Sequence, residues 1–286
     1  MKITAKKSLG QNWLNSPSAI NKIVTAGEIK PTDTILEIGP GRGALTKALL
    51  ATGAKVVAIE KDHQLISDLE NTFEPELKNG QLQLLEGDIL QASELLSLKN
   101  IAQADRAEHS NFPAGKYAHS ENLIASSYKV IANIPYYITG ELLRLFFETT
   151  NQPSLMVLMV QKEVAERIVA RDGKESILSI SVKVYGTPKI IATVPAGAFI
   201  PKPNVDSAIL AITNINHQAF PNTQTEVDFF AIVKQGFAQK RKLVKNNINC
   251  SEEIMTKCNL NIKARAETLT VSDWLCLTKN LKHNDH

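Results

Sequence analysis

Short apolar runs alternate with amphipathic stretches from residue 34 to about residue 134. Runs rich in Val, Ile and Leu have the length and composition of buried strands at residues 34–38, 55–60, 82–85, 129–132 and 154–160. Between them, residues 44–51 and 65–73 repeat apolar side chains at helical spacing. This rhythm predicts an α/β fold, with right-handed crossovers and a parallel sheet covered on both faces.

Two breaks in the rhythm indicate the domain organisation. Residues 97–127 form a polar tract, which we interpret as a surface insertion because loops of this length are uncommon inside compact domains. From Glu226 onward, strand signals vanish and helical spacing dominates. We therefore expect an α/β domain over residues 1–213 and a small helical domain over residues 214–286.

The composition is typical of a soluble globular protein. The chain has 286 residues, 43% hydrophobic and 21% charged, which suffices for a full core. No apolar run approaches the roughly 20 residues that cross a bilayer, and the basic start lacks the apolar stretch of a secretory signal. Because Cys250, Cys258 and Cys276 show no C-x-x-C spacing, we expect neither a disulfide framework nor a zinc site. A reducing, cytoplasmic compartment is the default.

Charge is distributed unevenly along the chain. Residues 1–30 carry a net charge of +4, residues 31–213 carry −4 and residues 214–286 carry +3. Basic ends around an acidic middle suit a polyanionic partner held at the flanks. Scattered solubilising lysines explain the pattern equally well.

A glycine-rich loop follows the first predicted strand. Gly39, Gly41 and Ala44 satisfy the G-x-G-x-x-G/A fingerprint, and Glu60 ends the next strand, where a carboxylate binds ribose hydroxyls. A nicotinamide dehydrogenase is therefore one interpretation, and a plain structural turn is another. Pro40 counts against the dehydrogenase, since it removes an N–H from the segment that would wrap a pyrophosphate.

A third acidic residue favours a different ligand. Asp88 follows the third predicted strand, where it can accept the exocyclic amine of adenine. Loop glycines, a ribose carboxylate and an adenine acceptor together suit a nucleoside cofactor without phosphates, and S-adenosylmethionine is the obvious one. Taken alone, Asp88 is equally well explained as a helix N-cap.

The tetrapeptide Asn133-Ile134-Pro135-Tyr136 ends the fourth predicted strand, at the sheet edge that faces ligands in open α/β folds. An adenine amino nitrogen is a poor nucleophile, because its lone pair is delocalised into the ring. The Asn133 side-chain oxygen and the Pro135 carbonyl can accept both amino hydrogens and favour a pyramidal nitrogen. Tyr136 can stack on an extruded base. Strand-to-turn punctuation is the alternative explanation.

With these residues in view, the chain resembles the KsgA/RsmA family of rRNA adenine N6,N6-dimethyltransferases. Five segments carry the resemblance, in the family's order: Lys7-Ser8-Leu9-Gly10-Gln11-Asn12-Trp13-Leu14, Glu37-Ile38-Gly39-Pro40-Gly41, Asn133-Ile134-Pro135-Tyr136-Tyr137, Gly197-Ala198-Phe199-Ile200-Pro201-Lys202-Pro203 with Val205-Asp206-Ser207, and Gln239-Lys240-Arg241-Lys242.

The resemblance implies a Rossmann-like fold, S-adenosylmethionine as cofactor, and dimethylation of two adjacent adenosines in the 3′-terminal hairpin of small-subunit rRNA. It implies cofactor contacts by Asn12, Leu14, Gly39, Gly41, Glu60, Asp88 and Asn133. Phe199 would supply a second aromatic face, so that the flipped adenine lies between it and Tyr136. Lys202, Lys240, Arg241 and Lys242 would meet phosphates, although on composition alone the run at 240–242 is more often a solvated helix face.

The chain departs from the family pattern in places. Trp13 stands where the family usually has Phe, which keeps an aromatic ring. A family loop rich in Gly and Lys is only loosely matched by Arg171-Asp172-Gly173-Lys174, and the insertion at residues 97–127 has no counterpart. We expect a monomer with no metal site.

Three other functions compete with small-subunit dimethylation. A large-subunit rRNA methyltransferase that confers antibiotic resistance shares the motif at Asn133. A non-catalytic nucleic-acid-binding assembly or transcription factor on the same fold has no need of Asn133, Pro135, Tyr136 and Glu60. The dehydrogenase leaves the motif at Asn133 and the segment around Phe199 unexplained.

Overall fold

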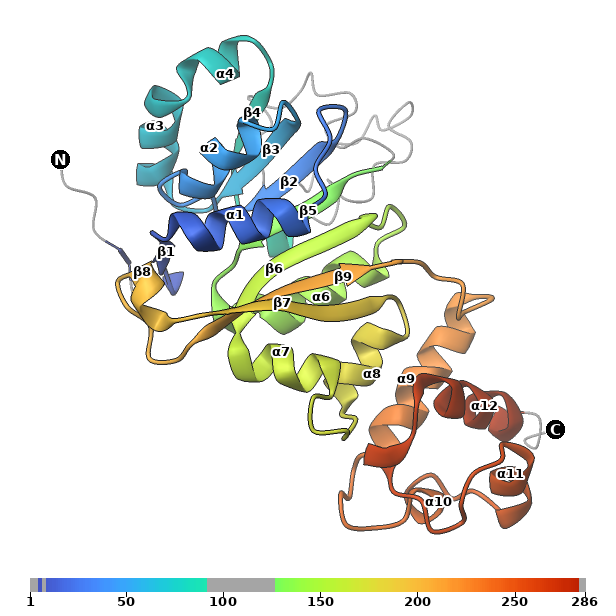
Figure 1. Cartoon of the computed structure of the whole chain (residues 1–286). Helices are drawn as coiled ribbons and strands as arrows, with labels where there is room; N and C mark the ends of the chain where they lie inside the picture. Colours follow the sequence, from blue (N-terminus) through green and yellow to red (C-terminus); the bar gives the residue numbers. More distant parts are fainter. Residues whose placement is uncertain (1–4, 7–8, 92–126, 283–286) are drawn as a thin grey trace. The chain divides into compact units, whose positions relative to one another are not determined.

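The computed structural model describes residues 5–6, 9–91 and 127–282 of the chain (Figure 1). Two compact units make it up: the first comprises Met1–Lys162 and Lys189–Ile215, and the second Glu163–Pro188 and Asn216–His286. None of the helices in the described part of the chain has the length and hydropathy of a membrane span. The predicted insertion at residues 97–127 lies, apart from Ser127, outside the described residues.

A seven-stranded sheet forms the centre of the first unit, with strand order β4-β3-β2-β5-β6-β9-β7. Its strands are β2 (Thr34–Ile38), β3 (Lys55–Glu60), β4 (Leu82–Glu86), β5 (Lys129–Asn133), β6 (Leu155–Gln161), β7 (Thr187–Val194) and β9 (Ser207–Thr213). The strands from β4 to β6 pair in parallel, and β9 pairs antiparallel to β6. The α/β class predicted from the sequence is confirmed, and the five predicted strands match β2 to β6 to within one residue at each end.

The expected parallel sheet is confirmed for its five predicted strands, but the whole sheet is mixed. Two strands that the hydrophobic pattern did not assign, β7 and β9, complete the sheet, and β9 runs against its neighbour. The alternating exposure of β7 marks a strand with one open face, whereas β9 is buried almost throughout. Antiparallel addition at one end is common among large, otherwise parallel sheets.

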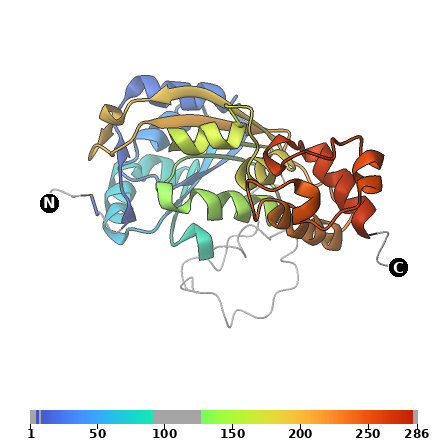
Figure 2. The same cartoon turned by 90° about the horizontal axis from the view of Figure 1, so that it is seen from below.

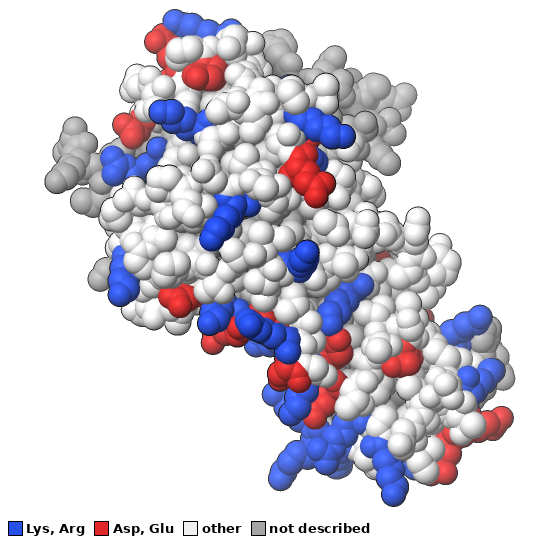
Figure 3. All heavy atoms as spheres, viewed as in Figure 1, with Lys and Arg blue, Asp and Glu red and all other residues white. Residues whose placement is uncertain are grey.

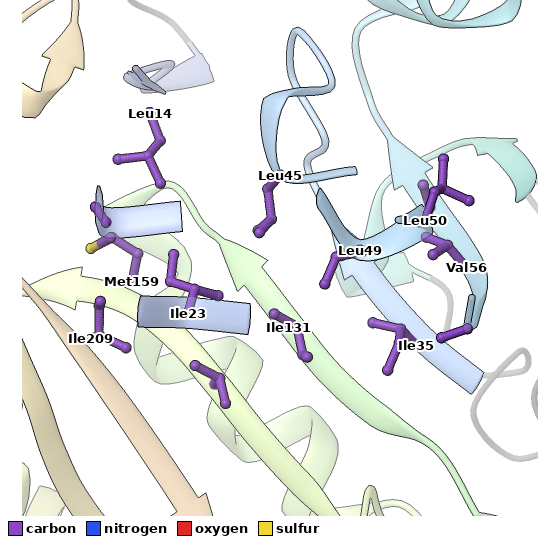
Figure 4. Packing of buried hydrophobic residues seen from close by; sticks show 14 of the residues in the cluster. Leu14, Ile23, Ile35, Leu45, Leu49, Leu50, Val56, Ile131, Met159 and Ile209 are labelled. Carbon is purple, nitrogen blue, oxygen red and sulfur yellow. The ribbon is translucent and has the colours of Figure 1, made fainter. Parts of the chain in front are cut away.

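Helices cover both faces of this sheet. The helices of the first unit are α1 (Pro17–Ala26), α2 (Ala44–Leu50), α3 (His63–Thr72), α4 (Glu74–Lys78) and α6 (Thr139–Glu148). Figures 1 and 2 show α1 on one face and α6 on the other. Val56 and Val57 point to opposite sides of β3 and are both fully buried, so neither face is open there. Figure 4 shows side chains of α1, α2 and the strands filling the layer between them.

A two-stranded ribbon lies at the edge of this core. β1 (Trp13–Leu14) pairs antiparallel with β8 (Phe199–Ile200), with Leu14 opposite Phe199. Both of these side chains are buried in the same hydrophobic cluster as α1 and α2. The ribbon therefore anchors the N-terminal segment to the first unit.

The second unit is helical in its described part. Its helices are α7 (Lys162–Val169), α8 (Ile177–Lys183), α9 (Thr223–Gly236), α10 (Val244–Asn247), α11 (Glu252–Lys257) and α12 (Val271–Lys282). Tyr185, Phe220, Phe229 and Phe230 form an aromatic cluster, and Phe237 packs on Trp274. The sequence placed a boundary at residue 214, whereas the contacts also group Glu163–Pro188 with the C-terminal helices.

Two of the three cysteines are paired. Cys258 and Cys276 form a disulfide with an S–S distance of 2.11 Å, and Cys250 is free and buried. The expectation of no disulfide framework did not anticipate this single pair. The pair is separated by 18 residues, and it meets because the end of α11 packs against α12, which cysteine spacing alone does not reveal.

Gly43, the N-cap of α2, is required by its surroundings. Its φ is +77°, and a Cβ there would lie 2.5 Å from Cε2 of the buried Phe73. We predict that Gly43→Ala lowers the free energy of unfolding by about 2–4 kcal/mol, from a strained backbone and an overpacked contact. Chemical denaturation measures this change.

Gly140 provides the matched control. It lies in α6 with no atom within 4 Å of its ideal Cβ, so Gly140→Ala should leave stability unchanged or raise it by up to about 1 kcal/mol. An unchanged denaturation midpoint for Gly43→Ala would contradict the described packing.

Candidate active site

A pocket of about 320 Å³ opens at the carboxyl ends of β2, β3, β4 and β5, within the first unit. This is the edge where open α/β sheets bind ligands, and the volume suits a small molecule. The wall comes from five segments: residues 9–13, the glycine loop, the end of β3, the turn after β4 and the motif after β5. It contains eight of the predicted site residues: Asn12, Gly39, Gly41, Glu60, Asp88, Asn133, Pro135 and Tyr136.

The glycine loop brings bare backbone to the pocket. Gly39 and Gly41 have φ values of +64° and +60°, which side chains rarely adopt. A Cβ on Gly39 would meet no atom within 4 Å, so its open side is available to a ligand. A Cβ on Gly41 would lie 2.9 Å from Cδ1 of Trp13. Gly39 thus leaves room for a ligand, whereas Gly41 leaves room for the Trp13 ring in the pocket wall.

Glu60 is buried at the end of β3 with 6% of its surface exposed. Its Oε2 accepts the Gly41 N–H at 3.1 Å, and its Oε1 accepts the Asp62 N–H at 2.9 Å. Burial raises the pKa of this carboxyl above its ordinary value, and the two backbone N–H groups oppose that shift. Each carboxylate oxygen retains a lone pair, so Glu60 can also accept hydroxyl hydrogens from a bound ribose.

Asp62 ties the N-terminal segment to the pocket, a role that the sequence did not reveal. Its side chain is 1% exposed; Oδ1 accepts Lys6 Nζ at 2.6 Å, and Oδ2 accepts Gln11 Nε2 at 3.0 Å. Burial alone would raise its pKa, but the hydrogen bonds from Lys6, Gln11 and the Gln64 N–H hold the pKa below its ordinary value. The only available signal was its position two residues after Glu60, directly before a helix.

Asp88 has two structural roles in the turn after β4. Its Oδ1 caps the Leu90 N–H at 3.1 Å, and its Oδ2 pairs with Lys61 Nζ at 2.8 Å. The alternative considered from the sequence, that Asp88 is an N-cap, therefore agrees with its hydrogen bond to the Leu90 N–H. Asp88 still lines the pocket, so binding of an adenine amine stays a prediction.

The motif after β5 presents polar groups to the same pocket. Asn133 Nδ2 donates to the Asn12 carbonyl at 3.0 Å, so the acceptor of the amide, Oδ1, is the atom that can serve a ligand. The Pro135 carbonyl accepts the Ile138 N–H at 3.2 Å and has a second lone pair. The half-buried Tyr136 is fixed by a 2.6 Å hydrogen bond between its hydroxyl and Ser207 Oγ.

The other predicted residues lie away from the pocket wall. Leu14 and Phe199 are 6% and 2% exposed and belong to the hydrophobic core, so stacking by Phe199 requires its ring to leave that core and stays a prediction. Lys202 is exposed in the loop after β8.

The basic run Lys240-Arg241-Lys242 belongs to the second unit, and all three of its residues are exposed. It occupies a turn between α9 and α10, so the alternative explanation, a solvated helix face, does not apply, and phosphate binding stays a prediction. The helix ends at Gly236, before the run. Figure 3 shows Lys and Arg side chains gathered along the lower edge of this unit in the view.

Two aromatic residues of the pocket wall were quoted in motifs but given no role. Trp13 lines the pocket beside Gly41. Tyr137 also lines it, is 62% exposed, and packs on Gly10, whose ideal Cβ would lie 3.0 Å from the ring. Their aromatic character was the signal that could have identified them.

Glu37 is a buried acid beneath the glycine loop. It is 1% exposed, and its Oε2 has no hydrogen-bond partner among the described residues. Burial, reinforced by the charge of Glu60, raises the pKa of Glu37 to about 8, although the Thr46 hydroxyl opposes the shift. The side chain is therefore protonated at neutral pH in the folded chain.

Comparisons with known proteins match the chain to rRNA methyltransferases. The family model described as Ribosomal RNA adenine dimethylase matches residues 2–283. A protein of Dehalococcoides mccartyi named Ribosomal RNA small subunit methyltransferase A is 37% identical, over 96% of this chain and 88% of its own. A protein of Thermosynechococcus vestitus with the same name is 35% identical, over 98% of both chains.

Solved structures share the fold. A dimethyladenosine transferase from Plasmodium falciparum has a TM-score of 0.71 at 24% identity, covering 95% of this chain and 98% of that one. The 23S rRNA methyltransferase ErmE has a TM-score of 0.67 at 19% identity, covering 95% of this chain and all of that one (100%). At these identities the likeness establishes the fold alone.

The raised pKa of Glu37 predicts a pH-dependent stability. Between about pH 4.5 and pH 8 the folded chain holds a proton on Glu37 that the unfolded chain releases, so the free energy of unfolding falls as pH rises through this window. Glu37→Gln removes the titration and should reduce the fall by at least about 1 kcal/mol. Urea denaturation from pH 5 to pH 9 measures it. Glu70→Gln, at an exposed position on α3, should leave the pH-dependent fall in the free energy of unfolding unchanged. The same fall in the unchanged chain and in both variants would contradict the raised pKa of Glu37.

Proposed function

The chain belongs to the ribosomal RNA adenine dimethylase family, and from this membership we propose that it transfers methyl groups from S-adenosylmethionine to the N6 amino groups of two adjacent adenosines in the 3′-terminal hairpin of small-subunit rRNA. The resemblance drawn from the five sequence motifs is thereby confirmed at the level of the family. The observation that carries the proposal is that the Asn133 amide, the Pro135 carbonyl and Tyr136 share a pocket with Glu60 and the glycine loop.

The pocket fits a nucleoside cofactor. The open side of Gly39 leaves room for a ligand against the backbone, and Glu60 has lone pairs for ribose hydroxyls. Asp88 lies at the neighbouring strand end for the adenine amine, and Asn12 contributes from the N-terminal segment. When bound, S-adenosylmethionine would supply an electrophilic methyl group on a sulfonium.

The residues of the motif after β5 would prepare the target amine. Because Asn133 Nδ2 is held by the Asn12 carbonyl, Oδ1 is directed as an acceptor toward one amino hydrogen, and the Pro135 carbonyl accepts the other. Two fixed acceptors favour a pyramidal nitrogen whose lone pair is no longer shared with the ring. Tyr136, held by Ser207, would stack on the extruded base. No strong base is needed, since the nitrogen becomes acidic as it is methylated.

Basic residues would bind the RNA backbone. Lys202 in the first unit and Lys240, Arg241 and Lys242 in the second are exposed and therefore available to phosphates. Relatives named for the small subunit favour that substrate over large-subunit rRNA. The intact polar motif disfavours a purely binding role. We expect a monomer that acts in the cytoplasm.

The test of the proposed reaction is Asn133→Ala. Loss of the amide acceptor should lower methyl transfer more than about 100-fold, a cost typical of removing one preorganised polar group from a transition state. Because Asn133 also holds the N-terminal segment through Asn12, cofactor affinity should fall by less than about ten-fold, the worth of one neutral hydrogen bond. RNA binding should be largely spared.

Transfer of labelled methyl groups to unmethylated small ribosomal subunits measures the rate, and calorimetry measures cofactor affinity. Asn71→Ala makes the same chemical change at an exposed position on α3 and should behave as the unchanged chain. Near-normal turnover by Asn133→Ala would defeat the proposed chemistry.

The exposed turn at 240–242 predicts a salt effect. If its three side chains contact phosphates, replacing all three by Ala should weaken binding to the small ribosomal subunit. A plot of log binding affinity against log salt concentration should then fall less steeply, its negative slope decreasing in magnitude by about 2. The matched control replaces Lys257, Lys263 and Lys279, three exposed lysines of the same unit, and should leave the slope nearly unchanged. The same salt dependence of binding in both triple variants would show that the turn at 240–242 does not contact the RNA.

A further inference from the structure

The pocket has two exposed side chains at its rim. Of the described residues that line it, only Lys61 and Tyr137 are exposed, and all the others are buried or half-buried. Lys61 already has a partner, because its Nζ pairs with Asp88 Oδ2 at 2.8 Å. Tyr137 is 62% exposed, so most of its side chain is open to a molecule that arrives at the mouth of the pocket.

Its position on the pocket distinguishes Tyr137 from the other exposed apolar side chains. Single exposed apolar residues are normal on protein surfaces and need no explanation. Six other large ones are exposed in the described part of the chain, and none of them lines the pocket: Ile177, Ile191, Ile200, Val205, Val227 and Ile262. Among the described residues, the Tyr137 ring is therefore the one large apolar surface that is exposed at this site.

The backbone directs Tyr137 away from its neighbour Tyr136. Both belong to the one-turn 3₁₀ helix Tyr136–Ile138. Successive side chains in such a helix point about 120° apart. Tyr136 is held by Ser207, whereas the Tyr137 ring lies against Gly10 of the N-terminal segment. When Tyr136 stacks on the target base, Tyr137 therefore does not share that base but faces what lies beside it.

The Tyr137 ring is also fixed in place. An ideal Cβ on Gly10 would lie 3.0 Å from Cε1 and 3.1 Å from Cδ1 of the ring, so one edge of the ring rests on this glycine. The hydrogen bond and charge of Asp88 raise the pKa of Lys61, and Tyr137 adds a smaller contribution, so its hydroxyl lies within electrostatic range of Lys61. Exposed aromatic rings close to cations are typical of surfaces that bind unpaired nucleotides. A ring that is already fixed loses little conformational freedom when a base stacks on it.

We propose that Tyr137 is an RNA-binding residue, whose ring stacks on the base next to the target adenosine along the RNA strand. This inference rests on the proposed function, which brings an extruded adenosine into the pocket together with the nucleotides beside it. Stacking does not read the identity of a base, because every base has an aromatic face. The same contact therefore serves whichever of the two adjacent adenosines occupies the pocket.

The decisive variants are Tyr137→Ala, which removes the ring, and Tyr137→Phe, which keeps the ring and removes only the hydroxyl. With unmethylated small ribosomal subunits as substrate, Tyr137→Ala should raise KM for the subunit about ten-fold, a typical cost of losing one stacked base, with kcat within about two-fold. Tyr137→Phe should keep KM within about two-fold of that of the unchanged chain. Cofactor affinity, measured by calorimetric titration with S-adenosylhomocysteine, should be the same in all three proteins.

Val227→Ala is the matched control, since it shortens a side chain that is 56% exposed and lies outside the pocket wall; it should leave KM unchanged. A normal KM for Tyr137→Ala would overturn the inference, and so would an equal rise for Tyr137→Phe, which would assign the effect to the hydroxyl. Weaker binding of S-adenosylhomocysteine by Tyr137→Ala would also overturn it, because the ring would then serve the cofactor. If the unchanged chain did not methylate the subunits, the proposed function would fail together with the inference; methylation with a normal KM for Tyr137→Ala would defeat the inference only.

Discussion

The buried carboxylate of Glu60 is the interaction on which the pocket depends. A charge in this position is costly unless it is hydrogen-bonded, and the two N–H groups that satisfy it come from the glycine loop and from Asp62, the second residue after β3. Burying the carboxylate therefore fixes the loop relative to the strand end. Asp62, which supplies one of those N–H groups, is also the N-cap of α3. Its carboxylate accepts hydrogen bonds from the side chains of Lys6 and Gln11.

These contacts form one connected network around the pocket. The Glu60 carboxylate accepts the N–H groups of Gly41 and Asp62. The Asp62 carboxylate accepts a hydrogen bond from the Gln11 side chain, and the carbonyl of the neighbouring Asn12 accepts one from the Asn133 side chain. Each link satisfies a polar group that would otherwise be buried alone or released to water. The glycine-loop wall of the pocket and the wall formed by the motif after β5 are thereby held by the same set of hydrogen bonds.

The sequence predicts the central strands well because their residues are buried on both faces, so that continuous Val, Ile and Leu runs mark them directly. It did not reveal β9, although that strand is nearly all apolar, because its antiparallel place beside β6 depends on a long excursion of the chain. The sequence places the glycines, Glu60, Asp88 and Asn133 at the pocket because each lies at or just after the end of a strand. Asp62 was missed because its importance lies in partners 51 and 56 residues away. Phe199 was assigned from a motif, but whether an aromatic ring lies in a wall or in a core depends on packing.

Asn133 shows why the residue type matters at this point. A carboxamide is planar and carries a donor at one end and an acceptor at the other, so fixing the donor on the Asn12 carbonyl sets the direction of the acceptor. An aspartate would place a negative charge opposite that carbonyl, and a serine is too short to reach two partners at once. Glutamine has the same two ends but adds a rotatable bond whose freedom must be lost for each productive arrangement. A short amide at the end of a buried strand, whose backbone is held by the neighbouring strands, therefore combines rigidity with both hydrogen-bonding functions. Its donor is fixed by the N-terminal segment that lines the same pocket, so that segment sets the direction in which the acceptor points.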